Sequence, residues 1–208
     1  MYPAAMIAED PMIEYAVSRA LTDSALADHR ALCESSVGLA EARSHFERSL
    51  EAARSGSPLA MVVVARCFAA GFGVARSPES AEKWATEACS KGFAPAFFLR
   101  AHLLPQSDRD SSEARSLLEQ SAEGGFTPAT LELADAWLDG RFGTSDLNKH
   151  ADYLVLAAGA GHPGSAMELA QAYEEGRGVS QDFLLARRWY EQAAELGYAM
   201  ACSRLSMA

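Results

Sequence analysis

The side chains that most often perform catalysis or bind metals occur in this sequence without the spacing that such chemistry requires. None of the five histidines lies in an HExxH motif or in another metal-ligand spacing. They are His29, His45, His102, His150 and His162. The adjacent acids Glu174 and Glu175, with Asp182 nearby, could form an acid pair, but the surfaces of helices carry such pairs routinely. We therefore expect no catalytic residue, no metal ligand and no cofactor.

Two glycine-rich turns, Gly71-Phe72-Gly73-Val74 and Gly176-Arg177-Gly178-Val179, are candidates for binding phosphate. A phosphate-binding loop follows a β-strand and ends in Lys followed by Ser or Thr, and neither turn has these neighbours. Each turn instead follows apolar residues at helical spacing, and Asp182 stands where the next helix would need an N-cap. Because glycine adopts the left-handed conformation that ends a helix, we interpret both turns as helix stops.

The helices that these turns would join repeat along the chain. Glycines recur at intervals of 36, 33, 36 and 36 residues, at Gly56, Gly92, Gly125, Gly161 and Gly197. Such a period indicates stacked helix-turn-helix units, because one helix pair cannot bury its apolar stripe alone. The copies begin at Ala60, Ala96, Ala129 and Ser165. The second copy has lost its glycine turn at residues 104–107, and the turn of the third is longer by one residue.

The repeated residues resemble the Sel-one-like repeat family, a branch of the tetratricopeptide-like α/α solenoids. Its pattern, Ala…Leu-Gly-x-x-Tyr-x-x-Gly-x-Gly-Val-x-x-Asp…Ala-x-x-Trp-x-x-x-Ala-Ala-x-x-Gly, covers about residues 57–208. Ala65, Ala134 and Ala170 stand where the family prefers its first glycine. The resemblance implies an all-α fold, a right-handed α/α superhelical solenoid of helix-turn-helix repeats. It also implies a non-catalytic, bacterial adaptor that assembles protein complexes.

Two regions are expected along the chain. Residues 1–35 do not show the repeat, and we interpret them as an N-terminal helical cap. Residues 36–208 would form the solenoid, with about four repeats and a C-terminal capping helix from Tyr198 to Met207. The segment 35–38 predicts a break, followed by a helix from Leu39 to Arg54.

In solenoids of this kind the first helix of each repeat lines the concave face, which would bind a partner protein or peptide. Counted from the first residue of each copy, positions +4 and +8 face the core, so +6 points away from it, with +2 and +9 beside it. With +10 added, the expected partner-binding residues are Val62, Arg66, Phe98, His102, Leu131, Asp135, Leu138, Asp139, Met167, Gln171, Glu174 and Glu175. An open alternative is that some of the apolar members pack against neighbouring helices.

Composition and charge restrict the partners. Of the 208 residues 49% are hydrophobic, which is ample for a core, and the formal net charge is −10. Binding of nucleic acid through a basic surface is disfavoured, since phosphates need Lys and Arg to neutralise them. An acidic balance is ordinary for soluble proteins, and the sharper hypothesis is that the partner presents a basic surface.

Targeting signals are absent from the sequence as given. It contains no apolar run of about 18 residues, so no membrane span is expected. Its first ten residues lack the basic start of a secretory signal, which predicts a cytoplasmic location.

The four cysteines are Cys33, Cys67, Cys89 and Cys202. A secreted, cysteine-rich branch of the resembled family pairs cysteines eight residues apart, but Phe97 and Ala194 stand where Cys89 and Cys202 would need partners. We expect buried free thiols that behave as small hydrophobes. A pairing of Cys67 with Cys89 remains open.

Two further functions follow from the resemblance as alternatives. Compact bacterial chains of this repeat also serve as immunity proteins, each neutralising one cognate secreted toxin, and an acidic surface would suit a basic toxin cleft. Some cysteine-rich relatives are linked to β-lactam hydrolysis, and the incomplete cysteine pairs argue against that enzymatic function here.

Overall fold

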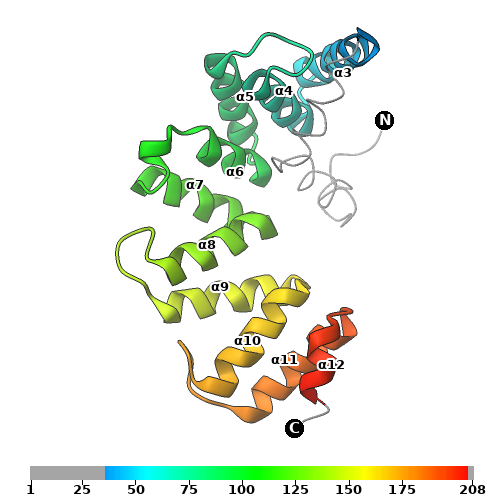
Figure 1. Cartoon of the computed structure of the whole chain (residues 1–208). Helices are drawn as coiled ribbons and strands as arrows, with labels where there is room; N and C mark the ends of the chain where they lie inside the picture. Colours follow the sequence, from blue (N-terminus) through cyan, green and yellow to red (C-terminus); the bar gives the residue numbers. More distant parts are fainter. Residues whose placement is uncertain (1–35, 206–208) are drawn as a thin grey trace. The chain divides into compact units, whose positions relative to one another are not determined.

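The computed structural model describes residues 36–205, whose regular elements are all helices (Figure 1). They are α3 (Ser36–Arg54), α4 (Pro58–Ala70), α5 (Pro78–Ser90), α6 (Ala94–Leu103), the 3-10 helix η2 (Gln106–Asp108), α7 (Ser112–Glu123), α8 (Thr127–Asp139), α9 (Leu147–Gly159), α10 (Pro163–Glu175), α11 (Phe183–Glu195) and α12 (Ala199–Leu205). No strand occurs among residues 36–205, so the predicted all-α class is confirmed. The predicted N-terminal cap, residues 1–35, lies outside the described residues.

The first described helix begins earlier than the sequence suggests. α3 runs without interruption from Ser36, so the predicted break at residues 35–38 and the helix start at Leu39 are wrong. A glycine inside a helix costs about 1 kcal/mol relative to alanine. Burial of Phe46 against the side chains of α4 contributes more than that, roughly 1.5–3 kcal/mol for a large apolar side chain.

The remaining helices form pairs in which each first helix (α4, α6, α8, α10) is followed by a second helix (α5, α7, α9, α11). Polar side chains fix where the second helices begin. Asp182 accepts hydrogen bonds from the backbone N–H groups of Leu184 and Leu185 at 2.9 and 3.0 Å, which confirms the predicted cap. Asp146 caps α9 in the same way, and Ser77 caps α5. Each cap satisfies backbone donors that the helix itself leaves free.

The glycine turns end the first helices and attach them to the preceding repeat. Gly176 ends α10 with φ 72°, the left-handed conformation that glycine adopts at little cost. The second glycine of the same turn, Gly178, packs so closely on α9 that a Cβ there would lie 2.0 Å from the carbonyl oxygen of Leu147. Gly73 makes the same approach to Ala42 of α3, at 2.2 Å. The helix-stop interpretation is confirmed, and the turns also dock adjacent repeats.

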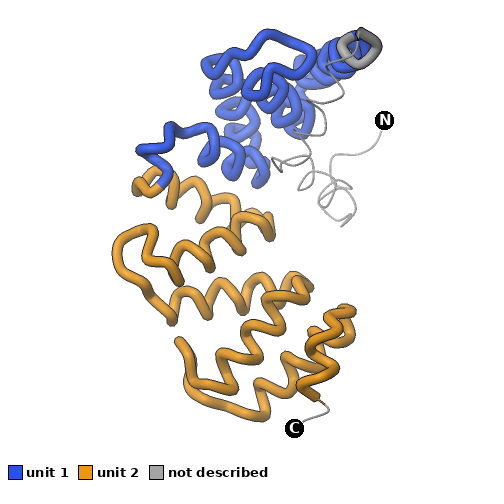
Figure 2. Tube along the Cα trace, in the orientation of Figure 1, with its two compact units in different colours: residues 1–109 blue, residues 110–208 orange. Residues whose placement is uncertain are grey.

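The chain divides into two compact units, residues 1–109 and residues 110–208 (Figure 2). The division falls inside the second copy, the one without a glycine turn. In unit 1, Phe46, Met61 and Val64 pack with small residues such as Ala85. In unit 2 the core contains Leu154, Leu169 and Tyr190, again with alanines at the close helix contacts. The prediction of a single solenoid from residue 36 onward stays a prediction.

Candidate interaction surfaces

Helix α6 is one turn shorter than the other first helices. It has 10 residues, whereas α4, α8 and α10 have 13 each. Pro105 explains the early end, because proline disfavours a helical conformation in the residue before it. Leu104 is accordingly extended, with φ −58° and ψ 148°. The second copy therefore lacks both the last helical turn and the glycine turn that follow in the other copies.

A cleft of about 460 Å³ lies in unit 1 at this shortened end. It is lined by the end of α4, the start of α5, the end of α6 and the segment that follows. The lining residues are Arg66, Ala69, Ala70, Arg76, Pro78, Phe98, Leu99, His102, Leu103, Leu104, Pro105 and Arg109. We call this the unit 1 cleft. Its lining contains three arginines and a histidine and no carboxylate.

The polar groups of the unit 1 cleft differ in exposure. Arg66 is buried, with 8% of its surface exposed, whereas Arg76 and Arg109 are exposed. Nη2 of Arg109 donates to the carbonyl oxygen of His102 at 3.4 Å. Nδ1 of His102 lies 2.9 Å from the carbonyl oxygen of Phe98, and the two rings are 4.3 Å apart between centroids. Since a carbonyl only accepts, this contact orients the imidazole with Nδ1 as the donor.

The structure brings together three of the residues expected to bind a partner, Arg66, Phe98 and His102. Arg76 and Arg109 were missed, because both lie in connecting segments to which helical periodicity does not apply. For two other residues the prediction of a partner-binding role is wrong. Val62 and Met167 are only 1% and 4% exposed, because neighbouring helices cover position +2 in these copies. Both are core residues, as the alternative interpretation allowed.

In unit 2, helix α8 presents an acidic and apolar surface. Asp135, Leu138 and Asp139 are exposed, with Leu138 at 38%. Neither aspartate makes an ion pair or hydrogen bond with the residues that the structure describes. Partial burial raises the pKa of Asp135; His150 opposes the rise, and the charge of Asp139 one turn away adds to it. We call Asp135 and Asp139 the α8 acidic pair. Leu131, on the same helix, is half-buried.

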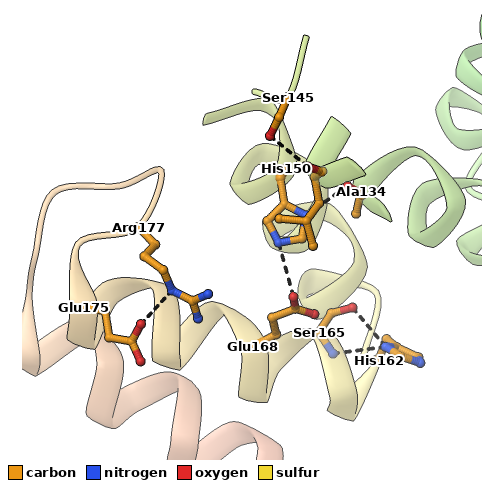
Figure 3. A network of polar contacts seen from close by, with 9 residues as sticks. Ala134, Ser145, His150, His162, Ser165, Glu168, Glu175 and Arg177 are labelled. Carbon is orange, nitrogen blue, oxygen red and sulfur yellow. Dashed lines mark hydrogen bonds and ion pairs between the residues drawn. The ribbon is translucent and has the colours of Figure 1, made fainter. Parts of the chain in front are cut away.

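The acids of α10 are held by neighbours in unit 2. Oε2 of Glu174 accepts from the Tyr190 hydroxyl at 2.5 Å, and burial together with this carboxylate raises the pKa of Tyr190 to about 12. Glu175 is exposed and forms an ion pair with Arg177 at 2.7 Å (Figure 3). Gln171 is half-buried. Of the acids expected on these first helices, the α8 acidic pair thus remains for a partner.

A buried histidine connects α8, α9 and α10 (Figure 3). Nδ1 of His150 lies 2.9 Å from the carbonyl oxygen of Ala134, and its Nε2 lies 3.2 Å from Oε1 of Glu168. Both neighbours are acceptors, so the ring donates from both nitrogens when it is protonated. His150 is 6% exposed. These contacts give it a structural role.

The lengthened turn of the third copy replaces glycine docking with side-chain contacts. Nη2 of Arg141 pairs with Oε1 of Glu132 at 2.8 Å, and its guanidinium lies 5.2 Å from the centroid of the Phe142 ring. Phe142 meets Trp137 edge to face, with 6.1 Å between centroids. A Cβ on Gly143 would meet nothing within 4 Å, unlike one on Gly178.

No group of three or more His, Cys, Asp or Glu within residues 36–205 is placed to hold a metal ion. A Ser-x-x-Lys spacing occurs at Ser80 and Lys83, but the Ser80 hydroxyl contacts Ser77 at 2.8 Å and Lys83 is exposed without a polar contact in the described part of the chain. None of the helices within residues 36–205 is long and apolar enough to cross a membrane.

The described cysteines are unpaired. Cys67, Cys89 and Cys202 are free, so the open pairing of Cys67 with Cys89 is not formed. Cys67 is buried and Cys89 is partly buried, but the expectation of a buried thiol is wrong for Cys202, which is exposed. Burial raises the pKa of both Cys67 and Cys89 to about 11. Both thiols are therefore protonated and unreactive near neutral pH.

Three segments of the chain, residues 58–93, 102–126 and 163–198, match the Sel1 repeat. The chain is a Sel1 repeat protein. The matched segments cover most of the first, second and fourth copies, and the copy with the lengthened turn lies between the last two. Sel1 repeat proteins are scaffolds for protein interactions.

Solved structures share this Sel1 repeat fold. A Sel1 repeat protein from Oxalobacter formigenes superposes with a TM-score of 0.67 and 26% identity, covering 80% of this chain and 49% of that one. A second structure is the protective antigen c5321 of uropathogenic Escherichia coli, which displays an SLR fold. It superposes with a TM-score of 0.64 and 25% identity, covering 77% of this chain and 35% of that one. The predicted solenoid class is confirmed by these two structures.

A curated relative is DAP3-binding cell death enhancer 1 of Mus musculus, 34% identical over 99 residues, which are 48% of this chain and 19% of the relative. The Sel1 repeat protein described here thus spans less than half of the length of each of these three proteins.

Proposed function

We propose that this Sel1 repeat protein is a non-catalytic adaptor that holds a segment of a partner protein on the first helices of its repeats. The family supports the coarse function, and the side chains on these helices support the finer one. In unit 2 the α8 acidic pair lies beside the exposed Leu138. A basic segment with an apolar side chain would complement both features.

The single observation that carries this proposal is the unfavourable position of the α8 acidic pair. Asp139 is the last residue of α8, where a negative charge opposes the helix dipole at a cost of about 0.3–1 kcal/mol. Asp135 precedes it by one turn, and like charges at this spacing repel by about 0.2–0.5 kcal/mol. Acids that reduce stability without pairing inside the described part of the chain are well explained by a partner that pairs with them.

The proposal is tested by affinity capture with the full chain, followed by titration of each captured protein. The variant Asp135→Ala with Asp139→Ala should weaken the main partner by roughly 2- to 30-fold, since exposed ion pairs contribute about 0.2–1 kcal/mol each. Asp152→Ala with Glu195→Ala is the matched control, because it removes two exposed acids from the second helices of the same unit. Equal affinities for the two double variants would refute the α8 surface.

The same capture distinguishes narrower functions. One tight partner that is toxic when expressed alone would identify an immunity protein, whereas several weaker partners would identify a general adaptor. Turnover of a β-lactam by the purified chain would contradict the non-catalytic assignment. We also propose a cytoplasmic location, which the free thiols of Cys67 and Cys89 support, since reducing compartments keep thiols unpaired.

A further inference from the structure

The charge of the chain is divided unequally between its described parts. Residues 36–109 carry nine Lys and Arg against seven Asp and Glu, whereas residues 110–205 carry seven against fifteen. The unit 1 cleft concentrates the positive charge further, because three of those nine cations line it and no acid does. A protein with a formal net charge of −10 thus contains a cationic cleft.

The shape of the cleft follows from the lost glycine turn. In the fourth copy, Gly178 covers the carbonyl oxygen of Leu147, the first residue of α9 after its N-cap. Pro78 holds the same place in α5, directly after the N-cap Ser77. Because the second copy has no glycine turn, no turn backbone covers Pro78, and this residue lines a cleft. The irregularity of the repeat and the cleft therefore share one cause.

The arginines are suited to a carboxylate. A guanidinium presents a planar fork of N–H donors that matches the two oxygens of a carboxylate, and such charge-assisted bonds are about twice as strong as neutral ones. Arg66 lies on α4 and is buried, with 8% of its surface exposed, so its position is defined. Arg76 makes no hydrogen bond or ion pair with another residue of the described chain, and Arg109 contacts only a carbonyl oxygen there.

The other walls are suited to an apolar side chain. Phe98, Leu103 and Leu104 are partly exposed and line the cleft together with the arginines. Aromatic and arginine side chains in one concave site are the composition typical of energetically dominant contacts between proteins. A ligand that carries an apolar group next to an anionic group would use both walls.

We propose that the unit 1 cleft binds an acidic segment of a partner protein, with an Asp, Glu or C-terminal carboxylate on Arg66, Arg76 and Arg109 and an adjacent Leu- or Phe-like side chain on Phe98 and Leu104. Charge complementarity favours this occupant. A nucleic acid would bring many phosphates toward a chain whose other described unit has a large excess of acids. The site is separate from the α8 acidic pair and has the opposite preference for charge.

The test is selection of 12-residue peptides from a random phage library on the full chain, followed by calorimetric titration of the selected peptides. We expect them to carry Asp or Glu next to Leu or Phe. Arg76→Glu with Arg109→Glu should weaken their binding by about tenfold or more, since both exposed cations become repulsive. Arg54→Glu with Lys91→Glu makes the same charge change at exposed positions outside the cleft and should alter affinity less than twofold. Arg66 is left intact in both variants because it is buried.

Several results would overturn the inference. Selected peptides that are basic, or equal affinities for the cleft variant and its control, would exclude an acidic segment in the cleft. A 12-nucleotide single-stranded DNA that binds more tightly than the peptides and depends on the same arginines would identify a nucleic-acid site. Dimers of the full chain that dissociate in the cleft variant would identify a second copy as the occupant. Loss of this inference leaves the adaptor proposal standing if the α8 variant still weakens the captured partner.

Discussion

At the scale of single residues, His162 shows how a titratable side chain replaces the usual cap of a helix. Nδ1 of His162 accepts hydrogen bonds from the backbone N–H of Ser165 at 3.1 Å and from its hydroxyl at 3.0 Å. Burial lowers the pKa of His162 below its ordinary value of 6.5. The cap needs an unprotonated nitrogen, so geometry and burial favour the same neutral form.

This cap should make stability depend on pH. As pH falls below about 6.5, the unfolded chain binds a proton at His162 that the folded chain resists, so the free energy of unfolding decreases. His162→Asn keeps an acceptor at a good N-cap and does not titrate. Urea unfolding between pH 8 and pH 5.5 should therefore show that the free energy of unfolding falls less steeply with decreasing pH in the variant than in the wild type. Parallel profiles would mean that His162 has no such role.

At the scale of elements, the docking of a turn on the preceding helix predicts a strong position effect among glycines. Gly178→Ala places a methyl group 2.0 Å from the Leu147 carbonyl oxygen at φ 69°. We expect this change to lower the free energy of unfolding by about 2–5 kcal/mol, the sum of the left-handed strain and the cost of displacing the backbone. At Gly161, with φ 87° and nothing within 4 Å of a Cβ, the change to Ala should lower the free energy of unfolding only by the left-handed strain, about 1–2 kcal/mol. Equal losses in thermal or urea unfolding would contradict the docking contact.

Most elements could be predicted because the sequence of a repeat marks where its helices begin and end. The glycine turn, the Asp cap and the alanine spacing agree in the third and fourth copies, and α8 to α11 follow them. The start of α3 at Ser36 could not be predicted, because Gly38 has a poor intrinsic helix propensity and packing further along the helix overrides it.

The candidate site was harder to predict than the fold. Helical periodicity placed Arg66, Phe98 and His102 on one face, and the unit 1 cleft contains all three. Periodicity describes one helix, so it could not show that neighbours cover Val62 and Met167. It also could not place Arg76 and Arg109, which reach the cleft from irregular segments.

At the scale of the whole molecule, charge is the property that most separates this chain from a neutral scaffold. Residues 110–205 contain more than twice as many acids as bases, and residues 36–109 contain a slight excess of bases. An excess of one sign reduces the stability of a compact chain through self-repulsion and raises the rate at which oppositely charged partners associate. The net charge and the local position of each acid contribute separately to the free energy of unfolding. A pair of single substitutions can distinguish the two contributions.

Asp139→Asn and Asp152→Asn each remove one negative charge from the molecule, but from different surroundings. Asp139 ends α8 one turn after Asp135, whereas Asp152 lies inside α9 with Lys149 three residues before it. In 10 mM salt we expect Asp139→Asn to raise the free energy of unfolding by about 0.5–1 kcal/mol and Asp152→Asn to change it by less than about 0.5 kcal/mol. The gain should shrink in 150 mM salt, where the Debye length falls from about 30 to about 8 Å. Equal gains for both variants in urea unfolding would show that net charge alone decides stability and would remove the energetic argument for a partner at the α8 acidic pair.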